Sequence, residues 1–118
     1  MQLGDAFVMS IPPVHLWFVI SDPTKNRGTY IIVNLTTDLF RAGKECVLNP
    51  GDHPWIRETS YISFADAIEI TPEHNKTVTS FIGTKIIMQS SLEPKILRKI
   101  IQAAKHSKAI SSGFKRYL

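Results

Sequence analysis

The sequence lacks several features that would assign it at once to a class of protein. Its single cysteine, Cys46, excludes an internal disulfide and a cysteine-based zinc site. Its longest apolar runs have the length of a β-strand, far short of the roughly 20 residues that a membrane-spanning helix needs. The N-terminus shows no basic region followed by an apolar segment, so we expect no secretory signal. Together these absences predict a cytoplasmic protein that does not enter a membrane.

The signatures of common catalytic machinery are also missing. The chain has no glycine-rich phosphate loop, no Ser-His-Asp motif and no Cys-His signature, which argues against hydrolysis of nucleoside triphosphates and against serine or cysteine protease chemistry. His15, His53 and His74 have neither the helical nor the hairpin spacing of metal ligands. We therefore expect no metal and no other cofactor.

The bulk composition is that of an ordinary folded domain. With 118 residues, 43% hydrophobic and 20% charged, the chain can bury a core and is not expected to be disordered. It has no internal repeat, no low-complexity tract and no inter-domain linker. The sequence predicts one domain over residues 1–118.

The net charge of +4 is distributed unevenly along the chain. From Ser91 onward there are seven Lys or Arg residues and one acid, Glu93, whereas the preceding part has seven bases and nine acids. This basic segment is typical of a solvated helix face with a basic tail. It is also typical of a surface that binds a polyanion such as nucleic acid.

The first third of the chain predicts three strands. Residues 6–9 form a short apolar run that Pro12 and Pro13 end, because proline cannot donate a ladder hydrogen bond. Residues 15–21 and 29–35 flank a turn-forming segment and predict a hairpin. Both runs are continuously apolar, so we expect them to be central strands that are buried on two sides or wrapped in a barrel.

The middle of the chain predicts shorter elements. Residues 45–48 form a candidate strand, and residues 60–64 alternate between polar and apolar side chains as a half-buried strand does. Residues 67–70 continue that strand after a bend. We expect a polar loop over 71–76 and a weak, β-branched strand over 77–81.

Apolar residues at helical spacing predict one helix near the C-terminus, over about 91–107. Ser91 is a plausible N-cap, and Pro94 is tolerated in a first turn. The apolar stripe consists of Ile96, Leu97, Ile100, Ile101 and Ala104. Short strands followed by one helix indicate a mostly β domain, built as a strongly curved sheet or an open barrel.

Polar residues near the ends of the hairpin strands are candidates for a site. Thr36 and Thr37 follow a buried strand, where threonine commonly hydrogen-bonds its own backbone. Their hydroxyls can also hold a phosphate oxygen. His15 begins the preceding strand, either as a structural residue or as a group that transfers protons near neutral pH.

The turn over residues 51–55 supplies a second group of candidates. Its Gly-Asp pair is ordinary turn composition. However, His53 follows a carboxylate, and Trp55 can stack on a nucleobase, as ribonucleotide sites require. Arg57 can stabilise the charge of a phosphoryl transition state.

The order of these segments resembles the MazF/PemK-like toxins of type II toxin–antitoxin systems. Similar to the family are the Gly-Asp strand over 4–8, the Phe-Val-Ile-Ser strand over 18–21 and the strand over 30–37 that ends in threonine. The segments over 45–48 and 92–101 are also similar. The chain departs from the family at His15, where members have Arg-Pro, and in its insertion over 51–55.

The resemblance implies a small SH3-like barrel with a C-terminal helix, often a homodimer. It implies a ribosome-independent endoribonuclease that cleaves single-stranded RNA without a metal, through attack by the 2′-hydroxyl. An acidic antitoxin protein would be its partner. The family's charged residue after the central loop maps to Arg57, Ser60 or Asp66.

Two hypotheses follow. The first is a metal-independent endoribonuclease in which His53 or His15 is the acid/base group and Arg57 stabilises charge. Its substrate-binding residues would be Thr36, Thr37, Ser60 and Trp55. The second is a non-catalytic SH3-like barrel that binds nucleic acid or protein. The catalytic hypothesis requires the end of the hairpin, with Thr37, and the turn that contains His53 to share one cleft, and it fails if Thr37 and His53 lie on opposite sides of the molecule.

Overall fold

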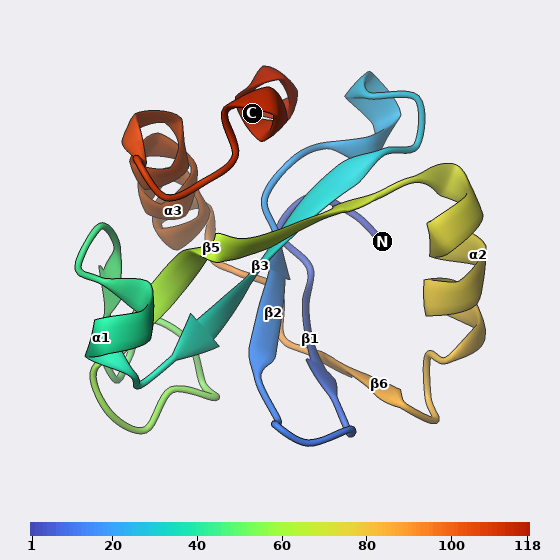
Figure 1. The fold of residues 1–118 in the computed structure, drawn as a ribbon. Helices are drawn as coiled ribbons and strands as arrows, with labels where there is room; N and C mark the ends of the chain where they lie inside the picture. The colour runs from blue at the N-terminus through green and yellow to red at the C-terminus, as the bar shows by residue number, and fades with distance from the viewer.

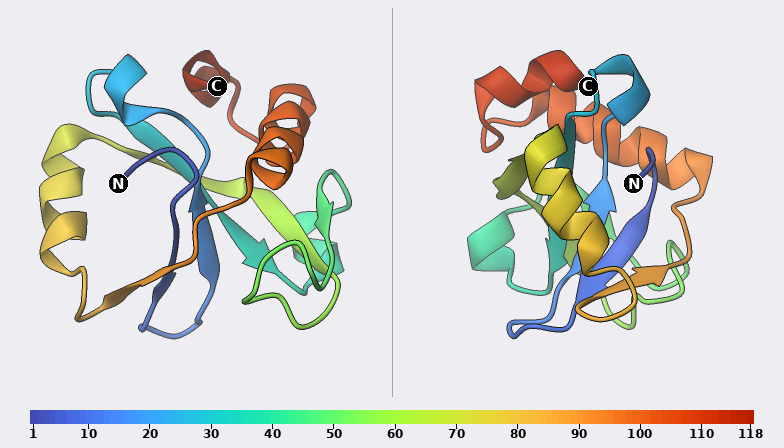
Figure 2. Two further views of the ribbon diagram at one scale, coloured as in Figure 1. Left: turned by 180° about the vertical axis from the view of Figure 1, so that it is seen from behind. Right: turned by 90° about the vertical axis from the view of Figure 1, so that its right-hand side faces the viewer.

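The computed structural model describes residues 1–118 and contains one antiparallel sheet of six strands (Figure 1). The strands are β1 (Ala6–Met9), β2 (Leu16–Val19), β3 (Tyr30–Thr36), β4 (Val47–Leu48), β5 (Ser60–Ile70) and β6 (Ile86–Gln89). Their order across the sheet is β4-β5-β3-β2-β1-β6, so β4 and β6 are its edges. The sheet curls strongly, and its strands wrap partway round a core (Figures 1 and 2).

Three α-helices and two short 3₁₀ helices connect and cover the strands. They are η1 (Pro23–Lys25), α1 (Leu39–Ala42), α2 (Pro72–Ser80), α3 (Pro94–His106) and η2 (Ser112–Tyr117). None of the helices has the length and hydropathy needed to cross a bilayer. One curled antiparallel sheet with a few helices around it is compatible with the mostly β fold expected from the sequence.

Side chains of the central strands alternate between two hydrophobic clusters on opposite faces of the sheet. In β3, Ile31 and Val33 belong to a cluster of 18 buried residues that includes Ile100 of α3. Ile32 belongs to a cluster of six buried residues, against which Val78 of α2 packs. Helices α3 and α2 therefore cover opposite faces, which agrees with their placement in Figures 1 and 2. Burial on both faces explains why these strands are continuously apolar.

The early strands agree with the sequence analysis. β2 and β3 form the expected antiparallel hairpin, with Trp17 opposite Asn34 and Phe18 opposite Val33. β5 is one strand with an irregular register opposite β3, where the sequence indicates a bend. β4 is shorter than the expected segment because Glu45 leaves the sheet and binds the C-terminal part of the chain.

The segment after β5 is the helix α2, and the expected loop and strand over 71–81 are wrong. β-branched residues there favour a strand by propensity alone. The side chain of Thr71 caps the helix, and a proline occupies the first helical position. The hydroxyl of Tyr30 donates a 2.6 Å hydrogen bond to Asn75 Oδ1, which holds the helix against β3. The fold therefore has more than the single C-terminal helix expected from the sequence.

The edge strand β6 has no counterpart in the sequence analysis, which assigns no element to residues 82–90. β6 is four residues long and pairs with β1, which lies almost 80 positions earlier in the chain. Such a short run becomes a strand because a distant partner supplies its hydrogen bonds.

The C-terminal helix is confirmed, with a later start. Its N-cap is Glu93 rather than Ser91, and the N–H of Leu92 donates to the carbonyl of Gly4 before the helix begins. The apolar stripe packs on the sheet as expected, and Ile100 and Ala104 are fully buried.

Candidate functional site

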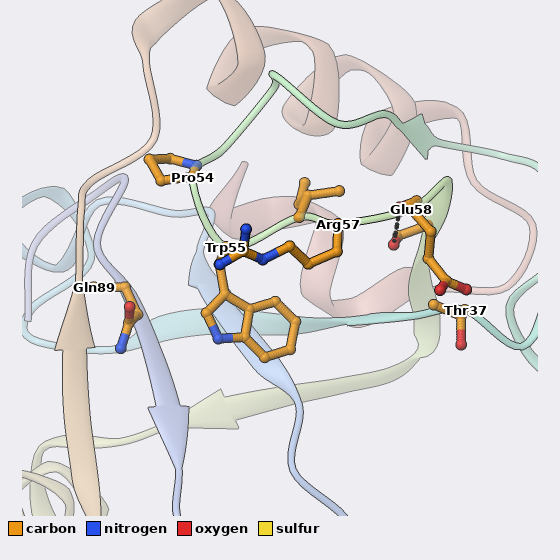
Figure 3. A pocket seen from close by; sticks show the side chains of 8 residues that line it. Thr37, Pro54, Trp55, Arg57, Glu58 and Gln89 are labelled. Carbon is orange, nitrogen blue, oxygen red and sulfur yellow. Dashed lines mark hydrogen bonds between the residues drawn. The ribbon is translucent and has the colours of Figure 1, made fainter.

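An open cleft lies beside the end of β3 (Figure 3). It has a volume of about 470 Å³. Glu58 and Thr37 lie at one end and Gln89 of β6 at the other, with Trp55 and Arg57 between them (Figure 3). The cleft therefore combines a cation, a carboxylate, an aromatic ring and a hydroxyl that makes no hydrogen bond within the protein.

Hydrogen bonds within the loop between β4 and β5 hold one wall of this cleft. Asp52 Oδ2 accepts a 2.8 Å hydrogen bond from the N–H of Asn49, and the N–H of Asp52 donates to the Asn49 carbonyl at 3.0 Å. Thr59 Oγ1 donates to Asn49 Oδ1 at 3.1 Å. Loop residues that close their own hydrogen bonds in this way can hold Trp55 and Arg57 in fixed positions.

His53 is part of this loop framework and does not line the cleft. Only 3% of the residue is exposed, and its ring packs edge-on to Phe18 with 5.9 Å between centroids. Nδ1 accepts a 3.0 Å hydrogen bond from the N–H of Trp55, so the proton is on Nε2, which donates to the Ser90 carbonyl at 2.6 Å. Both ring nitrogens are therefore engaged, and the geometry favours a structural role.

His15 has one ring nitrogen without a protein partner. Its Nδ1 lies 3.2 Å from the carbonyl oxygen of Leu35 and donates to it, because a carbonyl can only accept. In the neutral ring this leaves Nε2 as an unoccupied acceptor. His15 is half-buried, and the β3 backbone holds its ring in one orientation.

His15 lines a second, smaller cavity that adjoins the cleft. This cavity, of about 200 Å³, is also lined by Thr36, Thr37, Trp55 and Ser60. The cleft and the cavity share Thr37, Trp55 and Ser60. The structure thus brings together six of the seven residues selected from the sequence, and His53 is the one that stays outside.

The three hydroxyls at this site differ in availability. Thr36 Oγ1 accepts a hydrogen bond from the N–H of Asp38 at 3.1 Å, and Ser60 Oγ donates to the Glu58 carbonyl at 2.8 Å. Thr37 is exposed and makes no such bond. Its hydroxyl is therefore the one most readily offered to a ligand.

A polar cluster lies on the other side of His15. Asp66 Oδ2 accepts hydrogen bonds from Arg41 Nε at 2.9 Å and from Ser63 Oγ at 2.6 Å. The hydrogen bond from Arg41 holds the pKa of Asp66 below its ordinary value, and the nearby His15 acts in the same direction. Asp66, His15 and Asn34 line a third cavity, of about 350 Å³. His15 therefore lines two cavities.

Four residues of this region belong to no sequence pattern that indicates a site. Glu58, Gln89, Arg41 and Asn34 come from a loop, an edge strand, a short helix and a central strand that meet only in the folded chain. Of these, only Arg41 has a local cue, because Asp38 caps the helix in which it lies.

Two further ionisable residues, Glu45 and His74, do not line the cleft. Glu45 accepts hydrogen bonds from Ser107 Oγ at 2.6 Å and from the N–H of Lys108 at 2.8 Å. Partial burial opposes ionisation of this carboxyl, but these hydrogen bonds outweigh it and lower the pKa of Glu45. His74 is exposed on α2, away from the cleft.

Protein-family models and curated proteins provide no match to this chain. Its residues and their geometry therefore carry the functional argument.

Proposed function

We propose that this protein is a metal-independent endoribonuclease that cleaves single-stranded RNA, as its resemblance to the MazF/PemK-like toxins implies. The observation that carries the proposal is the free Nε2 of His15 at a cavity that adjoins the cleft of Thr37 and Arg57. A base, a neutral hydroxyl and a cation are the groups that phosphodiester transfer needs when no metal takes part.

In this reaction the 2′-oxygen of a ribose attacks the adjacent phosphorus. His15 Nε2 accepts the 2′-hydroxyl proton, and the new P–O bond forms as the bond to the 5′-oxygen breaks. Arg57 stabilises the negative charge on the phosphoryl oxygens, and the Thr37 hydroxyl donates to one of them. The departing 5′-oxygen takes a proton from water in the open cleft, and protonated His15 returns its proton to the hydroxide that remains. The products are a 2′,3′-cyclic phosphate and a free 5′-hydroxyl.

Other residues position the substrate. Trp55, which is 37% exposed, offers a ring face for a base to stack on. Thr36 and Ser60 shape the cavity beneath it through their backbone hydrogen bonds. His53 acts as a positioning residue, because its bond to the N–H of Trp55 orients that part of the wall.

The decisive experiment incubates the purified protein with single-stranded RNA in excess EDTA. The His15→Asn variant is informative, since an asparagine Nδ2 can replace the imidazole Nδ1 donor to Leu35 while removing Nε2. We expect a loss of about 10²- to 10⁴-fold in cleavage rate, as for other general bases. The matched control is His74→Asn, on the outside of α2, which should cleave at the wild-type rate.

Further variants separate binding from chemistry. Arg57→Ala and Thr37→Val should lower the cleavage rate while the protein keeps its circular dichroism spectrum. RNA that stays intact at an excess of folded wild-type protein would refute the proposal.

The second candidate is a non-catalytic barrel-like module that binds nucleic acid or protein. Two observations favour it. His15 stands where members of the MazF/PemK-like family have Arg-Pro, and the hydroxyls of Thr36 and Ser60 are already hydrogen-bonded to backbone groups. In this case RNA would be retained on a filter at low salt without being cleaved.

The proposal includes an SH3-like barrel architecture, a cytoplasmic location and two protein partners. An acidic antitoxin protein would suit the basic residues that follow Ser91. A homodimer is supported by Ile87 and Met88, which are 41% and 39% exposed on the edge strand β6. Light scattering after gel filtration tests the dimer, and Ile87→Lys should give a monomer.

A further inference from the structure

Helix α3 carries a stripe of cations on the side that faces away from the sheet. The stripe consists of Lys95, Arg98 and Lys105, which are all exposed, whereas Ile96 and Ile100 on the other side of the helix are buried. Residues three and seven positions apart lie on one face of an α-helix. With a rise of about 1.5 Å per residue, the stripe is about 15 Å long.

No acidic side chain neutralises this stripe. The structure has two ion pairs, Arg41 with Asp66 and Arg116 with Glu69, and neither includes a residue of the stripe. The only acid from residue 91 onward is Glu93, which lies at the N-cap before the first turn of the helix. The stripe is therefore a run of unpaired positive charge at the surface, and such a run attracts a polyanion.

The burial of the apolar side of α3 limits what the stripe can bind. A helix that lies on a membrane inserts its apolar face into the lipid. In α3 that face packs on the sheet through Ile100 and Ala104, so only the charged side is left to a partner. The phosphodiester backbone of a nucleic acid is a regularly repeating anion that Lys and Arg bind without apolar contact.

The stripe also begins close to the cleft. Gln89 lines the cleft, and Lys95 follows it by six residues, which span at most about 20 Å of extended chain. A strand of RNA whose scissile phosphate lies beside Thr37 and Arg57 can therefore reach α3 with its neighbouring nucleotides. A trinucleotide, by contrast, would occupy the cleft alone.

We propose that the stripe on α3 binds the phosphate backbone of the RNA strand outside the cleft. This inference rests on the proposed function for the class of ligand, and it does not depend on cleavage. Contacts to phosphate position a strand but carry no sequence information. The stripe would thus add affinity for long strands, without preference for any base. The basic residues that follow the helix, Lys108, Lys115 and Arg116, are not part of it.

The test measures binding of a long 2′-O-methyl oligouridylate, which cannot be cleaved because its 2′-oxygen has no proton to lose. The stripe variant combines Lys95→Gln, Arg98→Gln and Lys105→Gln, and glutamine preserves the helix. Each lost phosphate contact should reduce the slope of log K against log salt by about 0.7, so three should reduce it by about 2. Between 50 and 200 mM salt, the wild type should therefore lose about 20-fold more affinity than the variant.

The matched control combines Lys25→Gln, Lys44→Gln and Lys76→Gln, three exposed lysines that lie outside α3. It carries the same net charge as the stripe variant, and it should keep the wild-type slope. A 2′-O-methyl trinucleotide should bind the wild type and the stripe variant equally. A single-stranded DNA of the same length should show the same loss of slope as the RNA analogue, because the stripe contacts phosphates.

An unchanged slope in the stripe variant would overturn the inference, and so would an equal loss in the control, which would reduce the effect to net charge. An equal loss of trinucleotide binding would place the effect in the cleft. If the variant lost affinity for polyglutamate but not for the oligonucleotide, the stripe would belong to an acidic protein. Because no arm requires cleavage, a protein that never cleaves RNA can still pass or fail this test.

Discussion

His53 Nε2 and the Ser90 carbonyl oxygen are 2.6 Å apart and join the loop between β4 and β5 to the segment that connects β6 with α3. The loop and Gln89, the last residue of β6, line the cleft that contains Trp55. The hydrogen bond therefore ties the loop to the chain directly after β6. A histidine that the sequence offers as a catalyst serves here to position the residues that follow it.

Replacing this histidine should destabilise the protein. His53→Ala removes a buried ring and its bond to Ser90, and it leaves the N–H of Trp55 without its acceptor, so the free energy of unfolding should fall by about 2–4 kcal/mol. Urea denaturation monitored by circular dichroism measures the change. His53→Gln, whose amide can still donate to Ser90, should recover part of the loss. An alanine variant as stable as wild type would show that the bond contributes nothing.

The ion pair between Arg41 and Asp66 should make stability depend on pH at the acid end. Because the pKa of Asp66 is lower in the folded chain than the ordinary 3.8, its contribution is complete above that value. It is lost as the pH falls through the folded pKa. The Asp66→Asn variant should be less stable than wild type at pH 7, by about 1 kcal/mol or less for so exposed a pair.

Denaturation of both proteins at pH 7 and at pH 3 or below would test this prediction. The difference between them should shrink in acid. An unchanged difference would mean that ionisation of Asp66 is not its source.

The only thiol should be inert in the folded protein. Cys46 is 2% exposed, and burial raises the pKa of its thiol to about 11. The thiolate, which is the reactive form, is therefore scarce at pH 8. An aromatic disulfide reagent should modify the protein slowly at pH 8 and at once in denaturing urea. Fast modification of the native protein would contradict the buried placement of Cys46.

Packing of α3 on the sheet should account for a large part of stability. Ile100 is fully buried in the larger cluster, so Ile100→Ala should lower the free energy of unfolding by about 2–5 kcal/mol. The control is Gln102→Ala, on the exposed side of the same helix, which should change stability by less than about 0.5 kcal/mol. Equal effects of the two substitutions would mean that the helix does not pack on the sheet.

Several parts of the fold could be predicted because their determinants are local. The hairpin of β2 and β3 follows from two apolar runs around a turn, and the position of α3 follows from the helical spacing of Ile96, Ile100 and Ala104. The sequence did not predict α2, because its β-branched residues favour a strand and obscure the helix cap at Thr71. It did not predict β6, because the strand that pairs with it, β1, lies far away in the sequence.

The candidate site could be predicted in part for the same reason. Thr37 and Trp55 suit an RNA site by their residue types alone, and they share one cleft. Nothing local indicated that His53 would turn inward to Ser90, or that Asn34 would lack a partner. Both outcomes depend on chain segments tens of residues away.

By itself, the amino-acid sequence determined the central strands, the C-terminal helix and the residue types available for chemistry, because apolar spacing and turn residues act over a few positions. The tertiary structure alone decided which of those residues face a common cavity. That choice depends on the face of the curled sheet from which each side chain projects. It also depends on the distant backbone groups that accept or donate its hydrogen bonds. Neither is encoded within a single segment.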